Sequence, residues 1–181
     1  MRQRFQSQPL FQIVPIERIV LPLQSRDQFP SLLAGLQWIW IHPALLEQIF
    51  QVLERAVLAG KKATGRPGME LWQILVLGVV RLGLAADWDR LEHLANYDLL
   101  LRQMLGVPTD PWGKSSPLFH HQTLRDNVAL LDEAVLKEIN GLVAAAGRAV
   151  FGAPAPLQIK ADTYVLETDV HFPTDLNLLF D

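Results

Sequence analysis

The chain has 181 residues, half of them hydrophobic, with a formal net charge of −3 and no cysteine. A hydrophobic share of this size is enough to bury a domain core, which excludes global disorder. The absence of cysteine excludes disulfides, thiolate catalysis and cysteine-ligated zinc, and the net charge does not by itself indicate a nucleic-acid-binding protein.

Prolines interrupt the N-terminal part of the chain at short intervals. They stand at positions 9, 15, 22 and 30. Proline disfavours helix at its own position and at the residue before it. We therefore expect an extended arm over residues 1–42. The next segment, PALLEQIFQVLERAVL, spaces its apolar residues as one face of a helix and begins with Pro43, which suits a first helical turn.

In the stretch MELWQILVLGVVRLGL, apolar residues would occupy almost every face of a helix. This pattern predicts a helix in the middle of a bundle. Its most apolar run, ILVLGVV, is much shorter than the roughly 20 residues of a membrane span. No run typical of a signal peptide follows the first arginines. We expect a cytoplasmic protein without a membrane partner.

Two short helices are expected next, in ADWDRLEHLANY, with Asp87 as N-cap, and in YDLLLRQMLG, which Gly106 can close. Their tight connection gives them the size of a helix-turn-helix pair, and a plain helical hairpin with a solvated polar face is the alternative. HHQTLRDNVALL and DEAVLKEINGLVAAAG predict two more amphipathic helices, the second capped by Asp132. Together these segments form a predicted helical DNA-binding domain over residues 43–150.

Basic and amide side chains of this domain are suited to phosphates and base edges. Some lie on the expected helices and some in the basic, glycine-rich segment GKKATGRPG. The candidate DNA-binding residues are Lys61, Lys62, Arg66, Arg90, His93, Asn96, Arg102, Gln103 and Arg125. His120 and His121 raise the alternative of a metal site, but adjacent helical residues point in different directions, which favours solvated imidazoles at a loop-to-helix junction.

The pattern changes after Phe151. LQIKADTYVLE alternates apolar and polar residues as a strand does, and VHFP is suited to a second short strand. One or two strands are not independently stable, so residues 151–181 are expected to begin a further domain. Asp162 lies in the middle of the first strand, where it either faces solvent or binds Mg²⁺, a cation that prefers carboxylate oxygen. Glu167, Asp169 and Asp175 compete for that role.

Three stretches carry a resemblance to a known family: GKKATGRPGMELWQILVLGVVRLGLAADWDRLEHLANYD, HHQTLRDNVALLDEAVLKEINGLVAAAG and KADTYVLETDVHFPTDLNLLFD. They resemble bacterial insertion-sequence transposases of the ISNCY type. The opening RF, VPIERI and SRDQFP extend the likeness over nearly the whole chain. These enzymes are similar to the wider DDE transposase group, whose members join a helical DNA-binding front to an RNase H-like catalytic domain. In that domain two Asp and one Glu hold two Mg²⁺.

The resemblance implies a role for Asp162. In this group the first catalytic Asp lies on the first strand and is followed by a small hydroxyl residue, and Asp162-Thr163 matches that pattern. Asp162 is thereby implied as catalytic residue and metal ligand. The second Asp and the Glu would lie on later strands, beyond Asp181. The implied chain is mainly α, followed by the first one or two strands of a truncated RNase H-like α/β domain.

Expectations of function follow from this resemblance. The chain would bind the terminal repeats of an insertion sequence, would pair with itself or with a full-length transposase, and would neither cut DNA nor bind Mg²⁺ tightly by itself. The complete enzyme would use Mg²⁺ for DNA cleavage and strand transfer during transposition. Two alternatives stay open: a non-enzymatic helical module that binds DNA or protein and inhibits transposition, and the product of a non-functional gene remnant.

Overall fold

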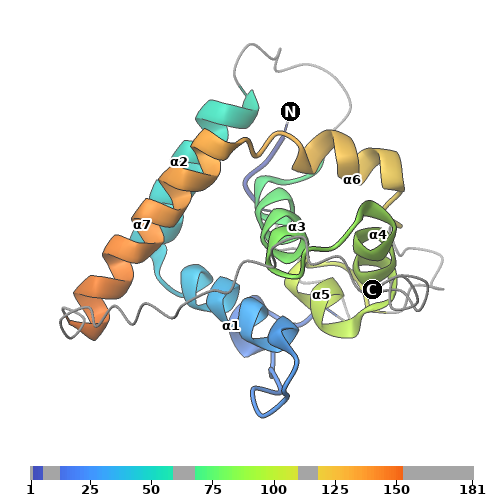
Figure 1. Cartoon of the computed structure of the whole chain (residues 1–181), viewed down its shortest axis with the longest axis horizontal. Coiled ribbons are helices and arrows are strands. Elements are labelled where there is room, and N and C mark those ends of the chain that lie inside the picture. The colour runs from blue at the N-terminus through green and yellow to red at the C-terminus, as the bar shows by residue number, and fades with distance from the viewer. Residues whose placement is uncertain (1, 6–12, 59–67, 110–117, 153–181) are drawn as a thin grey trace, which may run out of the picture.

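A computed structural model describes residues 2–5, 13–58, 68–109 and 118–152, and helices dominate these residues (Figure 1). The elements are η1 (Ile16–Arg18), α1 (Gln28–Trp40), α2 (Pro43–Leu58), α3 (Leu71–Gly83), α4 (Trp88–Tyr97), α5 (Leu99–Met104), α6 (His121–Val128) and α7 (Glu133–Phe151). No strand occurs in the described ranges, so the mainly helical fold is confirmed. The strands expected after Gly152 lie outside the described residues.

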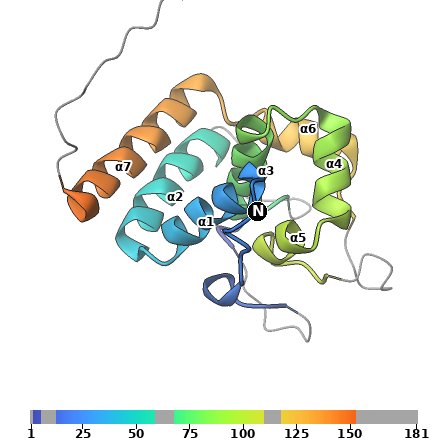
Figure 2. The same cartoon turned by 60° about the horizontal axis from the view of Figure 1, so that its bottom comes forward.

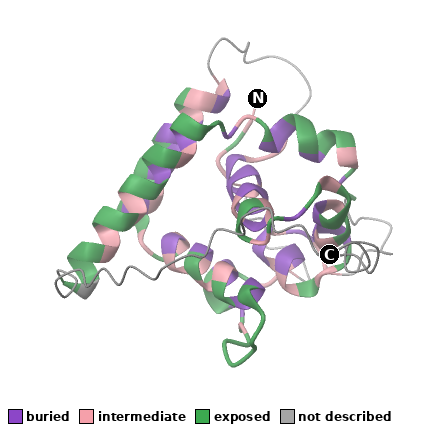
Figure 3. Ribbon diagram, viewed as in Figure 1, coloured by how far each residue is buried: buried purple, intermediate pink, exposed green. Residues whose placement is uncertain are grey.

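Helix α3 lies at the centre of the molecule. It packs against α1, α2, α4 and α6. Figure 2 shows α1, α2 and α7 on one side of it and α4, α5 and α6 on the other. Figure 3 shows mostly buried residues along α3, whereas the outward face of α7 is exposed. The buried residues of α3 are Leu71, Trp72, Ile74, Leu75, Val76, Leu77, Gly78 and Val80. The all-round apolar stretch thus forms the central helix that its pattern predicted.

Helices α2 and α7 form an antiparallel pair beside α3 (Figures 1 and 2). Leu45, Ile49 and Leu53 are buried on the inward face of α2, as the helical spacing predicted. On the outer side of the pair, the guanidinium of Arg55 lies 2.7 Å from the carboxylate of Glu138. The pair is therefore held mainly by apolar packing, because an exposed ion pair of this kind contributes little to stability.

Helix α1 differs from the extended arm that the prolines suggested for residues 1–42. Pro30 is the third residue of α1, and the first four N–H groups of a helix have no partner within it, so the missing N–H costs no hydrogen bond. Asp27 caps the helix by accepting from the N–H of Phe29 at 3.0 Å. The amide of Gln37 donates to the carbonyls of Ile16 and Ile19, which holds η1 on α1.

The first residues of the chain cap the central helix. The carbonyls of Gln3 and Arg4 accept from the N–H groups of Leu71 and Trp72, at 3.0 and 2.9 Å, so they satisfy two of the donors that a helix start leaves unpaired. Phe5 follows and packs edge-on against Trp40, with ring centroids 5.1 Å apart. Residues 3–5 therefore join α3 to the end of α1.

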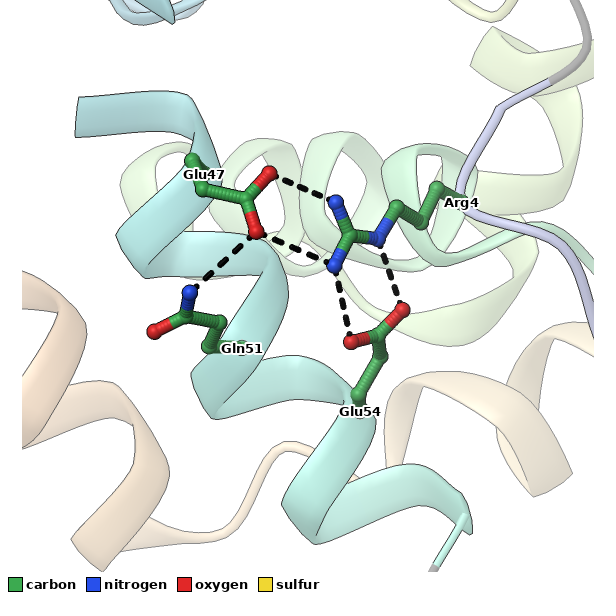
Figure 4. A network of polar contacts seen from close by, with 4 residues as sticks. All are labelled: Arg4, Glu47, Gln51 and Glu54. Atoms are coloured by element: carbon green, nitrogen blue, oxygen red, sulfur yellow. Dashed lines mark hydrogen bonds and ion pairs between the residues drawn. The ribbon is translucent and has the colours of Figure 1, made fainter. Parts of the chain in front are cut away.

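Arg4 also ties this N-terminal segment to α2. Figure 4 shows its guanidinium between two carboxylates, 2.6 Å from Glu47 and 2.7 Å from Glu54. Gln51 donates to Glu47 at 3.2 Å from the next turn of the same helix. The hydrogen bonds from Arg4, and then that from Gln51, hold the pKa of Glu47 below its ordinary value. The hydrogen bonds that Arg4 donates to Glu54, and then those it donates to Glu47, raise the pKa of Arg4.

Three predicted helix boundaries are confirmed. Asp87 accepts from the N–H of Arg90 at 2.7 Å, and Asp132 accepts from Val135 at 2.8 Å. Gly106 ends α5 with φ +66°, a left-handed conformation that glycine adopts without strain. The N–H of Val107 donates to Arg102 and that of Gly106 to Gln103, the paired hydrogen bonds of a Schellman motif.

Replacement of Gly106 by alanine should lower the free energy of unfolding. A left-handed backbone costs a residue with a side chain about 1–2 kcal/mol. The new Cβ would also meet the ring of Phe5. Gly35→Ala is the matched control, because the new Cβ has open space and the helix interior of α1 favours alanine by up to about 1 kcal/mol. In urea denaturation, the midpoint concentration should fall for Gly106→Ala and rise for Gly35→Ala. Equal shifts of the two midpoints would contradict the packing described for Gly106.

Acid should remove the contribution of Glu47. Because the folded pKa of Glu47 is lowered, its stabilising effect is full above the unfolded value, about 4.3, and is lost as pH falls through the folded pKa. The free energy of unfolding of Glu47→Gln should therefore lie below that of the original protein at pH 7, and the two values should converge toward pH 3. Denaturation at a series of pH values measures this. A constant difference would show that Arg4 does not act on Glu47 through charge.

Candidate nucleic-acid interface

Helices α3, α4 and α6 form a three-helix unit in which each packs against the other two. Residues 84–87 connect α3 to α4, and Ala85 in this turn has φ +47°, the left-handed region that alanine rarely adopts. Helix-turn-helix pairs are joined by a turn of about three to four residues that often contains glycine. The connection between α3 and α4 therefore has the form of a helix-turn-helix turn.

The pair that the sequence suggested, α4 with α5, does not have this form. Asp98 alone joins the two helices: its N–H donates to Leu94 at the end of α4, and its carboxylate accepts from Leu101 at the start of α5. Helix α5 has only 6 residues. The connection between α3 and α4 therefore fits a helix-turn-helix better than the one between α4 and α5, where a single capping residue leaves no room for a turn.

Asn96 is a structural residue of this unit. Its side chain accepts from the N–H of Phe119 at 2.7 Å and donates to the carbonyl of Phe119 at 2.8 Å, and the residue is 4% exposed. The two hydrogen bonds hold the segment before α6 against α4. Because both polar groups of the amide are used inside the protein, Asn96 is not available for a base edge.

Arg102 is fully buried, which corrects its expected role as a phosphate contact. Its guanidinium donates to the carbonyls of Pro108, Ala95 and Asn96, at 2.8, 3.3 and 3.2 Å. Ala95 and Asn96 are near the C-terminal end of α4, where a helix carries partial negative charge and favours a cation. Arg102 thus joins α4, α5 and the following segment. Gln103 is half-buried on α5.

Three candidates are exposed on the three-helix unit: Arg90 and His93 on α4, and Arg125 on α6. The outward faces of α4 and α6 meet where Nε2 of His121 lies 3.7 Å from the carboxylate of Asp89. His93 packs against Tyr97, with ring centroids 5.1 Å apart. The structure therefore brings these three candidates to adjacent helices of one unit.

Sequence reasoning missed two further polar side chains of this surface. Gln122 and Thr123 are exposed in the first turn of α6, and the amide of Gln122 donates to Asp126 at 2.7 Å. The buried residues Leu124 and Val128 point the opposite way. This spacing was the signal available in the sequence, since it assigns Gln122 to the solvent side of the helix.

The surface carries acidic as well as basic groups. Asp89 and Asp126 are exposed close to Arg90 and Arg125 in the sequence. Arg4 and Arg55 pair with glutamates outside this unit, and within it Arg81 stacks on the ring of Trp88 at 4.0 Å. The described part of the chain thus shows no uniformly basic face, and any phosphate contact from it depends on a few individual arginines.

The remaining predicted site residues lie outside the described ranges. They are Lys61, Lys62, Arg66, Asp162, Glu167, Asp169 and Asp175. Within the described ranges no group of three or more histidine or carboxylate side chains is arranged to hold a metal. His121 instead contacts Asp89, and His120 precedes α6 as its N-cap. None of the described helices combines the length and apolar character that a membrane crossing requires.

No protein-family model matches the chain, and searches of curated proteins and of solved structures gave no significant match.

Replacement of Asn96 by alanine should destabilise the protein. Both hydrogen bonds to Phe119 would be lost, and the N–H and carbonyl of Phe119 would stay buried without these partners. The free energy of unfolding should fall by about 2–3 kcal/mol. His93→Ala on the same helix is the matched control, since an exposed substitution usually changes stability by less than about 0.5 kcal/mol. Thermal and urea denaturation measure both. Equal stability of the two variants would contradict the structural role of Asn96.

Proposed function

We propose that residues 1–181 are the N-terminal, DNA-binding part of a DDE-type transposase and that they bind duplex DNA through the outward faces of α4 and α6. The observation that carries the proposal is the turn at residues 84–87 with α6 packed across both helices it joins. Small three-helix units of this type hold one helix firmly enough to enter a major groove. The resemblance of the sequence to insertion-sequence transposases supports the same conclusion.

The rigidity of the unit supports this proposal. A DNA-reading helix needs a fixed position relative to the phosphates that orient it. Helix α4 rests on the buried α3, its end is held by Arg102, and the two hydrogen bonds of Asn96 fix the entry to α6. The buried polar side chains therefore position the helices, and the exposed ones are left to contact DNA.

The exposed residues have suitable chemistry. Arg90 and Arg125 supply charge to phosphates, while His93 and Gln122 offer hydrogen-bonding groups to phosphates or base edges. Lys61, Lys62 and Arg66 are proposed as further phosphate contacts on sequence grounds. Asp89 and Asp126 weaken general attraction to phosphate, so we expect modest affinity for random duplexes and greater dependence on sequence.

The catalytic part of the proposal rests on the resemblance alone. Asp162 would contribute one carboxylate to a magnesium site, and that site needs further carboxylates to hold two metals about 3.5–4 Å apart. We propose that residues 1–181 by themselves bind the terminal repeats of an element and do not cleave them. Pairing with a full-length transposase, including inhibition of it, likewise rests on the resemblance alone.

Replacement of Arg90 or Arg125 by alanine should lower the affinity for DNA. It should also make that affinity less dependent on salt concentration. Each lost phosphate contact should reduce the slope of log affinity against log salt by about 0.9. Arg55→Ala is the control, because Arg55 pairs with Glu138 on the α2–α7 side of the molecule and its loss should leave the slope unchanged. Fluorescence anisotropy with terminal-repeat and random duplexes, at several salt concentrations, measures the slopes. Absence of binding at low salt would overturn the proposed function.

A further inference from the structure

An apolar groove runs between α1, α3 and α7, on a different side of the molecule from the proposed DNA contacts. Its cavity of about 490 Å³ is lined by Leu32, Leu36, Ile39, Leu75, Val79 and Val143, among others. Ser31 and Asn140 are the polar side chains that line it. An open apolar surface of this kind marks a binding site more often than a solvated face.

A second cavity, of about 400 Å³, continues the groove toward the end of α7. Trp38 lines both cavities, so the two lie next to each other. The wall of the second cavity on α7 includes Ala146, Ala149 and Val150, and Val150 is 56% exposed. The groove therefore extends to the last turn of α7, where the chain leaves the helix.

Helix α7 ends at this point. Gly152 has φ +77° and ψ 175°, a backbone conformation nearly confined to glycine, and Pro154 follows two residues later. Proline disfavours helix at the residue before it, so α7 does not continue past Gly152 along its own axis. Val150, two residues before Gly152, lines the second cavity.

The segment that follows has the composition to cover this surface. Residues 153–181 carry apolar side chains throughout, namely Leu157, Ile159, Val165, Leu166, Val170, Phe172, Leu176, Leu178, Leu179 and Phe180. An extended chain advances roughly 3.3 Å per residue, whereas the groove along α7 from Leu136 to Val150 spans about 21 Å at 1.5 Å per helical residue. The segment is long enough to fill both cavities.

We propose that residues 153–181 dock intramolecularly in the apolar groove between α1, α3 and α7. The inference does not depend on DNA binding, because it uses a different surface. Docking would remove the apolar walls of both cavities from water, which favours association, and the covalent attachment at Gly152 gives the segment a high effective concentration. If the chain continues into a catalytic domain, this contact would attach that domain to the helical unit.

Cysteine cross-linking tests the proposal in the full chain, because the sequence contains no cysteine of its own. Gly35 lines the groove and an added side chain there has open space. Gly35→Cys would be combined with a cysteine at Leu166, Phe172 or Leu179. A disulfide forms only when the two Cα atoms approach to within about 7 Å.

The control is Gly141→Cys with the same second cysteines. Gly141 also has open space around its Cβ but lines neither cavity. At least one pair with Gly35→Cys should form the intramolecular disulfide more than tenfold faster than its Gly141→Cys counterpart, measured by mass spectrometry after mild oxidation. Ser31→Cys, a nearly isosteric change in the same groove, repeats the test if Gly35→Cys disturbs α1.

Three results would overturn the proposal. Equal rates from the groove and from Gly141 would show that the segment meets both sites only by chance. If the variants with a cysteine in the groove formed disulfide-linked dimers faster than the intramolecular disulfide, the groove would bind a second copy of the chain. Absence of any cross-link in the groove would leave residues 153–181 outside it. A failure of DNA binding would affect none of these outcomes, so the two proposals are tested separately.

Discussion

The burial of α3 is the constraint on which the rest of the structure depends. A helix that is apolar all round has to be covered on every side, and α1, α2, α4 and α6 provide that cover. The coverage is tight: a Cβ at Gly78 would overlap Leu131, and one at Gly83 would overlap Leu32. The start of the helix is covered too, since the carbonyls of Gln3 and Arg4 satisfy its first donors. Residues as far apart in the sequence as Gln3 and Leu131 are thereby fixed around one element.

This constraint also explains which polar residues remain for function. Asn96 and Arg102 resemble DNA contacts in the sequence, but both are used to hold α4, α5 and the segment before α6 in place around α3. A buried guanidinium is tolerated here because three main-chain carbonyls accept its hydrogen bonds. Arg90, His93 and Arg125 lie outward on the supported helices. Positioning and contact are therefore divided between buried and exposed residues of the same unit.

The sequence was sufficient to predict α2, α3, α4, α6 and α7, because apolar periodicity and the caps Asp87 and Asp132 depend on local chemistry. The sequence was insufficient to predict α1, because Pro30 was treated as a helix breaker. Pro30 is tolerated in the first turn of α1 only because the helix starts just after Asp27. The sequence assigned the helix-turn-helix pair to α4 and α5 from their size and tight connection, whereas the connection with the length of such a turn, residues 84–87, lies between α3 and α4. The burial of Arg102 depends on Pro108 and Ala95, which lie six and seven residues away and approach it only in the folded chain.

The two proposed surfaces use different stripes of the same helix. Leu75 and Val79 of α3 line the apolar groove, whereas Gly78 packs against Val128 and Leu131 at the end of α6. Because α3 is buried in a close-packed core, a ligand on one side does not need to deform the helix in order to bind. The two surfaces can then be occupied together, with any coupling between them limited to their shared dependence on the stability of α3. The proposed DNA contacts and the apolar groove would then depend on different faces of one central helix.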